Sequence, residues 1–228
     1  MTRKSSRHTE QLPDLFDEGD VGAVGEDFRS LAAARKAAAD CTRCPLYKDA
    51  TQTVFGDGPP DAPVVFVGEQ PGDQEDIKGK PFVGPAGLLF DRALADADID
   101  RKRVYVTNAV KHFKFDPRGK RRMHKKPNNS EIEACRWWLD KELGLIKPQL
   151  AVALGVTAAR GLTGRDVTIS RVRGEIIPLR AGLNGFITVH PSYLLRLPDA
   201  DSKAREYERF IHDLKLIARH VRAIRTAA

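Results

Sequence analysis

Short apolar runs alternate with amphipathic stretches along most of the chain. Apolar runs that are rich in β-branched residues and bounded by turn residues predict buried strands. They occupy residues 64–67, 103–110, 149–155, 174–180 and 185–192. Strands that alternate with helices pack as a mainly parallel sheet covered on both faces, so the pattern indicates an α/β domain.

The amphipathic stretches predict helices at residues 26–40, 85–97, 128–143, 156–162 and 203–224. Pro85 suits the first turn of the second helix, and Ser130 with Glu133 predicts a capping box at the start of the third. The last helix carries one apolar stripe, which consists of Tyr207, Phe210, Ile211, Leu214, Ile217 and Val221. No internal repeat interrupts this alternation.

The length of 228 residues fits one domain, which we place at residues 26–228 after a flexible tail at residues 1–25. With 41% hydrophobic and 30% charged residues, the composition is that of a soluble globular protein, and no apolar run is long enough for a membrane span. The first residues lack the apolar core of a secretory signal. We therefore expect a cytoplasmic monomer with no membrane partner.

The positive charge of the chain is concentrated in one segment. Residues 111–126 hold eight Lys and Arg against the single acid Asp116, a net charge of +7 that equals the net charge of the whole chain. A charge excess confined to one loop, here residues 111–127, indicates an anionic partner, and nucleic acid is the usual one. A solvated basic loop without a partner is the alternative. His124 stands in this loop among Lys120, Arg121, Arg122, Lys125 and Lys126.

Polar residues follow three of the predicted strands. Glu69 comes after the first strand, Asn108 ends the second and His190 follows the last. Because ligands of parallel sheets bind at the carboxyl ends of the strands, we expect these three side chains at one rim. Alone, each could be a turn residue, a backbone cap or a packed imidazole, but together they suit acid/base chemistry and recognition.

Three cysteines raise the question of a metal. Cys41 and Cys44 form a C-x2-C pair, whereas Cys135 lies on the apolar stripe of its predicted helix, where a lone cysteine is usually a small hydrophobic residue. A disulfide framework does not suit a reducing compartment. No fourth cysteine completes a site, so metal binding and simple burial both remain open.

Several motifs occur in an order that resembles a known family. "GEQPGDQED" with "GKPFVGPAG", then "VTNAVK" and finally "HPS" resemble the uracil-DNA glycosylase superfamily, in particular its iron–sulfur members of the family 4 type. "KRRMHKKP" between the second and third motifs resembles the UdgX subgroup. The likeness covers about residues 36–220. It implies a three-layer α/β/α fold around a central, mainly parallel four-stranded sheet.

The resemblance also implies roles at the rim. An enzyme that removes a base from DNA flips the nucleotide into a pocket and reads its Watson–Crick edge. Asn108 would donate to uracil O4 and accept from N3–H, and cytosine would offer neither of these hydrogen bonds. Phe82 would stack on the base, with ordinary core packing as the alternative. Glu69 would favour the sugar cation, and a neutral His190 would donate to O2 of the departing base. The residues expected to support substrate or DNA binding are Gln70, Asp73 and Ser192, and Asp73 and Asp76 are expected to help position water or the loop.

In the iron–sulfur glycosylases a cysteine commonly follows the "TN-x-V-K" motif, and His112 takes that place in this chain. The resemblance therefore implies a structural [4Fe–4S] cluster held by Cys41, Cys44, His112 and Cys135, because histidine replaces cysteine in some iron–sulfur centres. By spacing alone, a Cys3His zinc site fits equally well and remains the less favoured alternative.

The same likeness gives His124 a role. In the UdgX subgroup a loop histidine attacks C1′ after uracil has left, so the protein stays bound to abasic DNA. Flanking cations disfavour a protonated imidazole and hold the DNA backbone, which suits such an attack. Leu194 and Leu195 are candidates for a wedge in the base stack, or for core packing. Three hypotheses remain: a glycosylase that cross-links itself to uracil-containing DNA, a turnover glycosylase in which His124 only touches phosphate, and a non-catalytic binder of abasic or single-stranded DNA.

Overall fold

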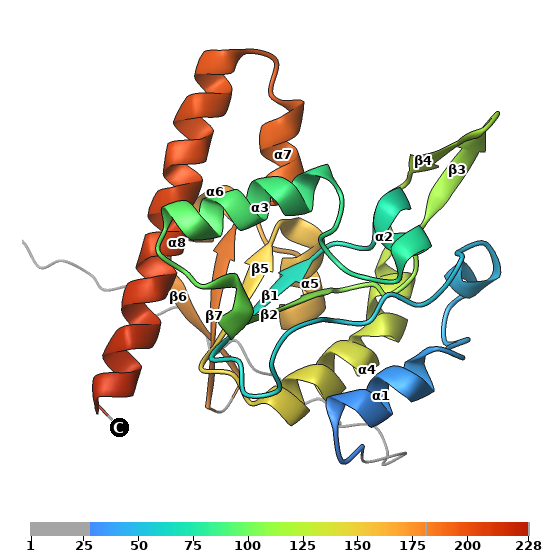
Figure 1. Ribbon diagram of the computed structural model, residues 1–228, viewed down its shortest axis with the longest axis horizontal. Helices are drawn as coiled ribbons and strands as arrows, with labels where there is room; N and C mark the ends of the chain where they lie inside the picture. Colours follow the sequence, from blue (N-terminus) through green and yellow to red (C-terminus); the bar gives the residue numbers. More distant parts are fainter. Residues whose placement is uncertain (1–27, 181, 228) are drawn as a thin grey trace, which may run out of the picture.

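The computed structural model describes residues 28–180 and 182–227, so the predicted tail at residues 1–25 lies outside the described part. A five-stranded sheet forms its centre, in the order β2-β1-β5-β7-β6 (Figure 1). Its strands are β1 (Val64–Gly68), β2 (Val104–Asn108), β5 (Leu150–Leu154), β6 (Ile176–Arg180) and β7 (Leu183–Thr188). The first four strands in this order are parallel, and β6 pairs antiparallel with β7. The four-stranded sheet that the resemblance implied is therefore short by this antiparallel edge strand, although the apolar run at residues 174–180 did predict β6 itself.

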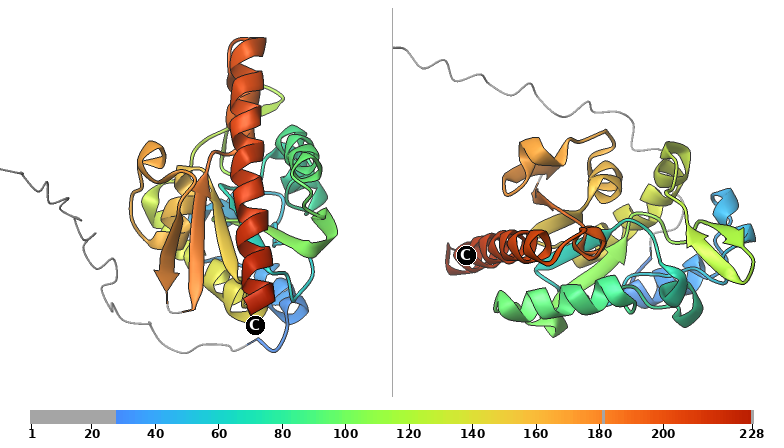
Figure 2. Two further views of the ribbon diagram at one scale, coloured as in Figure 1. Left: turned by 90° about the vertical axis from the view of Figure 1, so that its left-hand side faces the viewer. Right: turned by 90° about the horizontal axis from the view of Figure 1, so that it is seen from above.

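Helices cover both faces of this sheet. The helices of the described ranges are α1 (Leu31–Ala38), α2 (Asp73–Lys78), α3 (Pro85–Asp96), α4 (Asn129–Ile146), α5 (Val156–Thr163), α6 (Ile169–Val172), α7 (Pro191–Arg196) and α8 (Ala200–Ala227). Two short 3-10 turns, η1 (Pro45–Lys48) and η2 (Arg101–Arg103), complete the described elements. Helices α3 and α8 lie on one side of the sheet, and α4 and α5 lie on the other (Figures 1 and 2).

The alternation of side chains along β1 divides the core into two layers. Phe66 packs with α3 and α8, whereas Val65 and Val67 pack with α4 and α5, and all three are fully buried. Each such side chain stabilises the fold by roughly 1.5–3 kcal/mol. The predicted stripe of the last helix faces the first of these layers. The predicted three-layer α/β/α architecture is thus confirmed.

Helix α4 begins earlier than its predicted capping box. The side chain of Asn128 accepts a hydrogen bond from the backbone N–H of Glu131, and the Glu131 carboxylate accepts one from the N–H of Asn128. The prediction of Ser130 and Glu133 was wrong by two residues, because "NNSEIE" offers two overlapping sets of capping residues and the chain uses the first.

The predicted basic loop is a β-hairpin. Strands β3 (Phe115–Arg118) and β4 (Arg121–His124) pair antiparallel, and Gly119 in the turn adopts a φ of 57°, which costs glycine little. Figure 1 shows the hairpin projecting from the body of the domain beside α2. None of the helices in the described ranges combines the length and apolarity that a bilayer crossing needs.

Candidate active site

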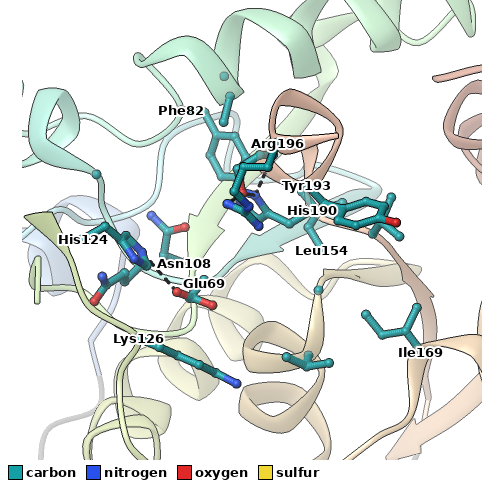
Figure 3. A pocket seen from close by; sticks show the side chains of 18 of the residues that line it. Glu69, Phe82, Asn108, His124, Lys126, Leu154, Ile169, His190, Tyr193 and Arg196 are labelled. Carbon is teal, nitrogen blue, oxygen red and sulfur yellow. Dashed lines mark hydrogen bonds and ion pairs between the residues drawn. The ribbon is translucent and has the colours of Figure 1, made fainter. Parts of the chain in front are cut away.

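Three strand ends meet at one cavity. Glu69 after β1, Asn108 at the end of β2 and His190 after β7 line a cavity of about 970 Å³ (Figure 3). The register of the sheet explains this meeting, because β1 and β2 pair Gly68 directly with Asn108. The parallel strands therefore deliver a carboxylate, an amide and an imidazole to the same rim.

The Glu69 carboxylate is held by two neighbours. Thr157 donates its hydroxyl hydrogen bond to Oε2 at 2.8 Å, and Nε2 of His124 lies 3.1 Å from Oε1. Burial alone would raise the pKa of Glu69, but the hydrogen bonds from His124 and Thr157 outweigh it and hold the pKa below its usual value. Glu69 is therefore a carboxylate at neutral pH.

His190, in contrast to the charged Glu69, is kept in its uncharged form. Burial lowers the pKa of its imidazole to about 4, so the ring is neutral at neutral pH. The backbone N–H and the hydroxyl of Ser192 both lie at Nδ1, at 3.1 and 2.8 Å. Because the N–H must donate, Nδ1 is the acceptor and the ring proton sits on Nε2. Ser192 thus fixes the tautomer of His190 from within the protein. Arg196 in turn donates a hydrogen bond to the hydroxyl oxygen of Ser192 at 3.0 Å.

Asn108 and Phe82 form the next part of the cavity wall. Both are almost fully buried, and the Phe82 ring lies 6.1 Å from the His190 ring at an angle of 29°. Phe82 also packs on Phe90 in the core. The ring therefore belongs to the core and also lines the cavity where a base could stack on it. Its φ of 58° is unusual for a bulky residue and indicates backbone strain held by the surrounding packing.

The absence of a side chain at Gly68 makes room for the Asn108 amide and the Phe82 ring. A methyl group at this position would overlap Oδ1 of Asn108 and approach the Phe82 ring. Only a glycine therefore lets these two side chains approach the end of β1 at the same time.

Arg122 attaches the basic hairpin to α2. Its Nε lies 2.6 Å from Asp73 and its Nη1 lies 2.5 Å from Asp76, whose side chain is fully buried. The guanidinium also lies over the rings of Phe113 and Phe115. Arg122, which we predicted to contact DNA, is thus engaged within the protein, and Asp73 and Asp76 hold the hairpin.

Gln70 fixes the root of the same hairpin. Its amide nitrogen donates to the carbonyls of Lys114 and Lys125, and its amide oxygen accepts from the N–H of Lys114. Both of its donor hydrogens are used in this way, so its side chain anchors the hairpin. Gln70 also lines the cavity, and its contact with the substrate stays a prediction.

The cations of the segment divide into two groups. Lys111 is fully buried against Glu142, Lys114 pairs with Glu131 and Lys125 pairs with Asp116. The exposed cations without such a partner among the described residues are Arg118, Lys120, Arg121 and Lys126. The positive charge that faces solvent is therefore smaller than the sequence count, and Lys126 lines the cavity itself.

Cys41, Cys44 and Cys135 belong to one buried cluster. Burial raises the pKa of the Cys135 thiol to about 12, and its sulfur accepts the backbone N–H of Lys111 at 3.1 Å. His112 lies at the neighbouring small cavity with Cys41, and its buried Nδ1 has no hydrogen-bond partner among the described residues. Within the described ranges, no group of three possible ligands is close enough for one metal ion. The four residues are therefore buried near one another but do not form a closed single-ion site in the described ranges.

Leu194 and Leu195 separate in the structure. Leu194 is 3% exposed and packs in the core, whereas Leu195 is 44% exposed. The wedge interpretation is therefore wrong for Leu194 and stays a prediction for Leu195.

Sequence reasoning missed Thr157 and Glu75. Thr157 starts α5 after β5, at the same rim as Glu69, but the end of β5 carries no acid, amide or imidazole that would draw attention to it. Glu75 accepts the backbone N–H groups of Gly72 and Gly84 and so joins the two glycine-rich motifs of the rim. The capping position of Glu75, three residues after Gly72, was the available signal.

The fold and the rim define an α/β protein that binds its ligand at the carboxyl ends of parallel strands. The chain belongs to the uracil DNA glycosylase superfamily, whose family model matches residues 55–215. It is 42% identical over 157 residues to the type-4 uracil-DNA glycosylase of Thermotoga maritima, covering 68% of this chain and 78% of that protein. The type-4 enzyme of Pyrobaculum aerophilum is 38% identical over 168 residues (70% and 81% covered), and that of Sulfurisphaera tokodaii is 30% identical over 195 residues (82% and 86% covered). The predicted superfamily is confirmed, and the UdgX subgroup stays a prediction.

Proposed function

We propose that this protein excises uracil from DNA by cleaving the N-glycosidic bond. The observation that carries the proposal is the pairing, at one cavity, of a carboxylate kept ionised with an imidazole kept neutral, Glu69 and His190. The similarity to type-4 uracil-DNA glycosylases over two thirds of the chain supports it.

Recognition of the base falls to Asn108 and Phe82. A nucleotide flipped out of DNA would place its base against the Phe82 ring and its Watson–Crick edge against the Asn108 amide. The amide donates to O4 and accepts from N3–H of uracil. Cytosine presents a donor and a bare acceptor at these two positions, so both hydrogen bonds would be lost.

Bond cleavage separates charge in a direction that the cavity favours. The electrons of the C1′–N1 bond leave with the base as a uracil anion, and the sugar becomes an oxocarbenium cation. The Nε2–H of His190 would donate to O2 of the anion, while the Glu69 carboxylate stabilises the cation. Neither residue changes its protonation state for this step, so no proton transfer delays it.

We further propose that His124 then forms a covalent bond to C1′. The ring nitrogen that carries no proton supplies the electron pair for the new bond, and the proton on the other nitrogen, now more acidic, passes to the Glu69 carboxylate. The 3.1 Å contact between His124 and Glu69 supports this step, because it holds the ring beside the group that faces the sugar. The "KRRMHKKP" motif and its resemblance to the UdgX subgroup support it as well.

Two other functions make different predictions. A turnover glycosylase would release abasic DNA and leave His124 unmodified, and a non-catalytic binder would leave uracil in place. To separate them, the protein is mixed with a uracil-containing oligonucleotide and the products are resolved under denaturing conditions. We expect a slower band that is absent with the thymine oligonucleotide. Free abasic product without that band would favour the turnover enzyme, and unchanged DNA would refute the excision itself.

We also propose that Cys41, Cys44, His112 and Cys135 hold a structural [4Fe–4S] cluster. Their common burial and the unpartnered Nδ1 of His112 support this ligand set. Such a cluster would join the segment after α1, the root of the hairpin and α4. A brown protein with iron and sulfide in equal amounts is the expected result, and zinc without iron would refute the cluster.

A further inference from the structure

The cavity is larger than one base requires. Its volume of about 970 Å³ is near the upper limit for pockets that enclose a whole small-molecule ligand. The residues proposed to act on uracil occupy one part of it. Beyond His190, the cavity continues past Tyr193 on α7 toward Ile169 on α6 (Figure 3). We call this second part, lined by Val156, Ile169 and Tyr193, the distal subsite, and Arg196 lies at its border beside His190 (Figure 3).

The distal subsite presents an aromatic ring with no partner. Tyr193 is 42% exposed, and among the described residues its ring pairs with no other ring and its hydroxyl makes no hydrogen bond. Val156 is exposed to the same extent and lines the same cavity. A flat, exposed aromatic ring flanked by aliphatic side chains is the surface on which a nucleobase stacks, whatever its sequence.

Charge at the distal subsite suits a polyanion. Glu206 lies there, but it pairs with Arg173 and with Arg209 at 3.4 Å, and Asp213 pairs with Arg173 at 2.7 Å. These four groups therefore sum to zero. Arg196 donates to the Ser192 hydroxyl and makes no ion pair with a described carboxylate, so its positive charge remains available. A phosphate next to Arg196 would meet net positive charge.

We propose that the distal subsite binds the base next to the uracil on the same strand, stacked on Tyr193, with an adjacent phosphate at Arg196. The inference rests on the proposed function, because it assumes that uracil occupies the part of the cavity near Asn108. Tyr193 and His190 are three residues apart on one short segment and line the same cavity, so we assign the base at Tyr193 to the nucleotide that adjoins the flipped one. In a duplex the neighbouring base stays paired and stacked. The subsite therefore favours an unpaired strand.

The test uses 2-aminopurine, whose fluorescence falls when it stacks. Single-stranded oligonucleotides carry 2′-fluorinated deoxyuridine, whose glycosidic bond resists cleavage, and 2-aminopurine on either side of it in turn. We expect quenching at one of the two neighbouring positions with the wild-type protein and with Tyr193→Phe, and none with Tyr193→Ala. The Kd of Tyr193→Ala should rise by about tenfold, because stacking of one base on an aromatic ring is of this order. Leu88→Ala, which removes an exposed apolar side chain outside the cavity, is the matched control and should keep the quenching.

A second comparison removes the base instead of the ring. Replacing the quenched neighbour by an abasic spacer should weaken binding to the wild type by about the same factor and leave the Kd of Tyr193→Ala unchanged. Annealing the complementary strand should reduce the difference between wild type and Tyr193→Ala. Quenching that persists in Tyr193→Ala, or quenching at neither position, would overturn the proposal.

The outcome is separable from that of the proposed function. Excision is measured on an ordinary deoxyuridine oligonucleotide with the wild-type protein. A protein that excises uracil but shows no Tyr193-dependent quenching refutes only the distal subsite. A protein that shows the quenching but excises no uracil refutes the proposed function and retains the subsite.

Discussion

Nε2 of His124 lies 3.1 Å from Oε1 of Glu69, although α2, α3, β2 and β3 all lie between the two residues along the chain. The contact joins the end of the hairpin to the rim of the sheet. It brings the imidazole of His124 to the carboxylate that is proposed to face the sugar. His124 is still 52% exposed at its side chain, so a DNA sugar can approach it.

Replacing His124 by serine should convert a cross-linking protein into a turnover enzyme. His124→Ser removes the nucleophile but leaves Glu69, Asn108 and His190 in place, and the smaller side chain admits water to C1′. We expect no covalent band on a denaturing gel and more than one abasic product released per protein molecule. Met123→Ser is the matched control, because Met123 is an exposed neighbour on the same strand and should leave the covalent band intact. A His124→Ser protein that neither cross-links nor cleaves would show that the imidazole is needed for excision itself.

Arg122 should matter for the covalent step more than for binding. Arg122→Gln removes the ion pairs to Asp73 and Asp76. Among the described residues, the buried Asp76 carboxylate then keeps only the N–H of Thr51 as a hydrogen-bond donor. The hairpin that carries His124 then loses its main attachment to α2. We expect the ratio of covalent product to free abasic product to fall by about tenfold, a loss of about 1.4 kcal/mol in positioning.

The neighbouring cation provides the control for this prediction. Arg121 is exposed, and no partner of its side chain occurs in the described ranges. Arg121→Gln removes the same charge, so it should weaken DNA binding in a salt-dependent way and leave the product ratio unchanged. Equal product ratios for the two variants would mean that Arg122 acts as a phosphate contact after all.

The rim could be predicted from sequence because it follows from the strands. Glu69, Asn108 and His190 each stand directly after an apolar run, and parallel strands place such residues together without further information. The apolar stripe of α8 likewise predicted its buried face. The spacing of apolar residues and the position of a polar residue after a strand are local properties of the sequence. They can therefore be read without knowing how distant segments pack.

Pairing between distant charges could not be predicted in the same way. The sequence shows Lys111 and Arg122 as two of eight cations in one segment, yet the first is buried against Glu142 and the second is bound to α2. Which cation meets which carboxylate depends on how the hairpin docks, and the charge count carries no information about docking. The capping box of α4 was misplaced because overlapping candidates stand side by side.

A methyl group at Gly68 should impair recognition of the base. Gly68→Ala would push the Asn108 amide and the Phe82 ring away from the end of β1. Since two hydrogen bonds to uracil depend on that amide, we expect the excision rate to fall by about a hundredfold, or about 2.7 kcal/mol. Gly144→Ala is the matched control: Gly144 lies in α4 with nothing near its Cβ position, and alanine there should be neutral or stabilise the fold by up to about 1 kcal/mol. An undiminished excision rate in Gly68→Ala would contradict the role of Asn108.

The pH dependence of excision follows from Glu69 and His190. Both pKa values are lowered, that of His190 to about 4, and both groups act in their deprotonated forms. The active forms are therefore fully populated at neutral pH. Neutral His190 is lost as the pH falls through about 4, and ionised Glu69 is lost only below the ordinary range of a glutamate. We expect a flat single-turnover excision rate from pH 5 to 8 and a steep fall below pH 4.5, with circular dichroism at each pH to confirm that the protein stays folded. A rate that already falls near pH 6.5 would indicate that His190 titrates in the ordinary range.

The buried pair of Lys111 and Glu142 links stability to the rim. The Lys111 ammonium lies 2.5 Å from Oε2 of Glu142 and also donates to the backbone carbonyl of Asn108 at 2.8 Å. Lys111→Met would leave Glu142 as a buried carboxylate that has lost its cation, which typically costs about 3–5 kcal/mol. We expect that loss in the free energy of unfolding measured by denaturant titration, together with slower excision because the backbone at Asn108 is released.

Two further variants decide whether the buried charge is the cause. Lys125→Met removes an ammonium from an ion pair that is more than half exposed on both sides, so it should cost less than about 1 kcal/mol. In the double variant Lys111→Met/Glu142→Gln no unpaired charge remains, and the amide can still accept from Tyr105 and Thr107. It should therefore regain a large part of the lost stability. If the double variant is no more stable than Lys111→Met, packing of the lysine side chain rather than its charge stabilises the root of the hairpin.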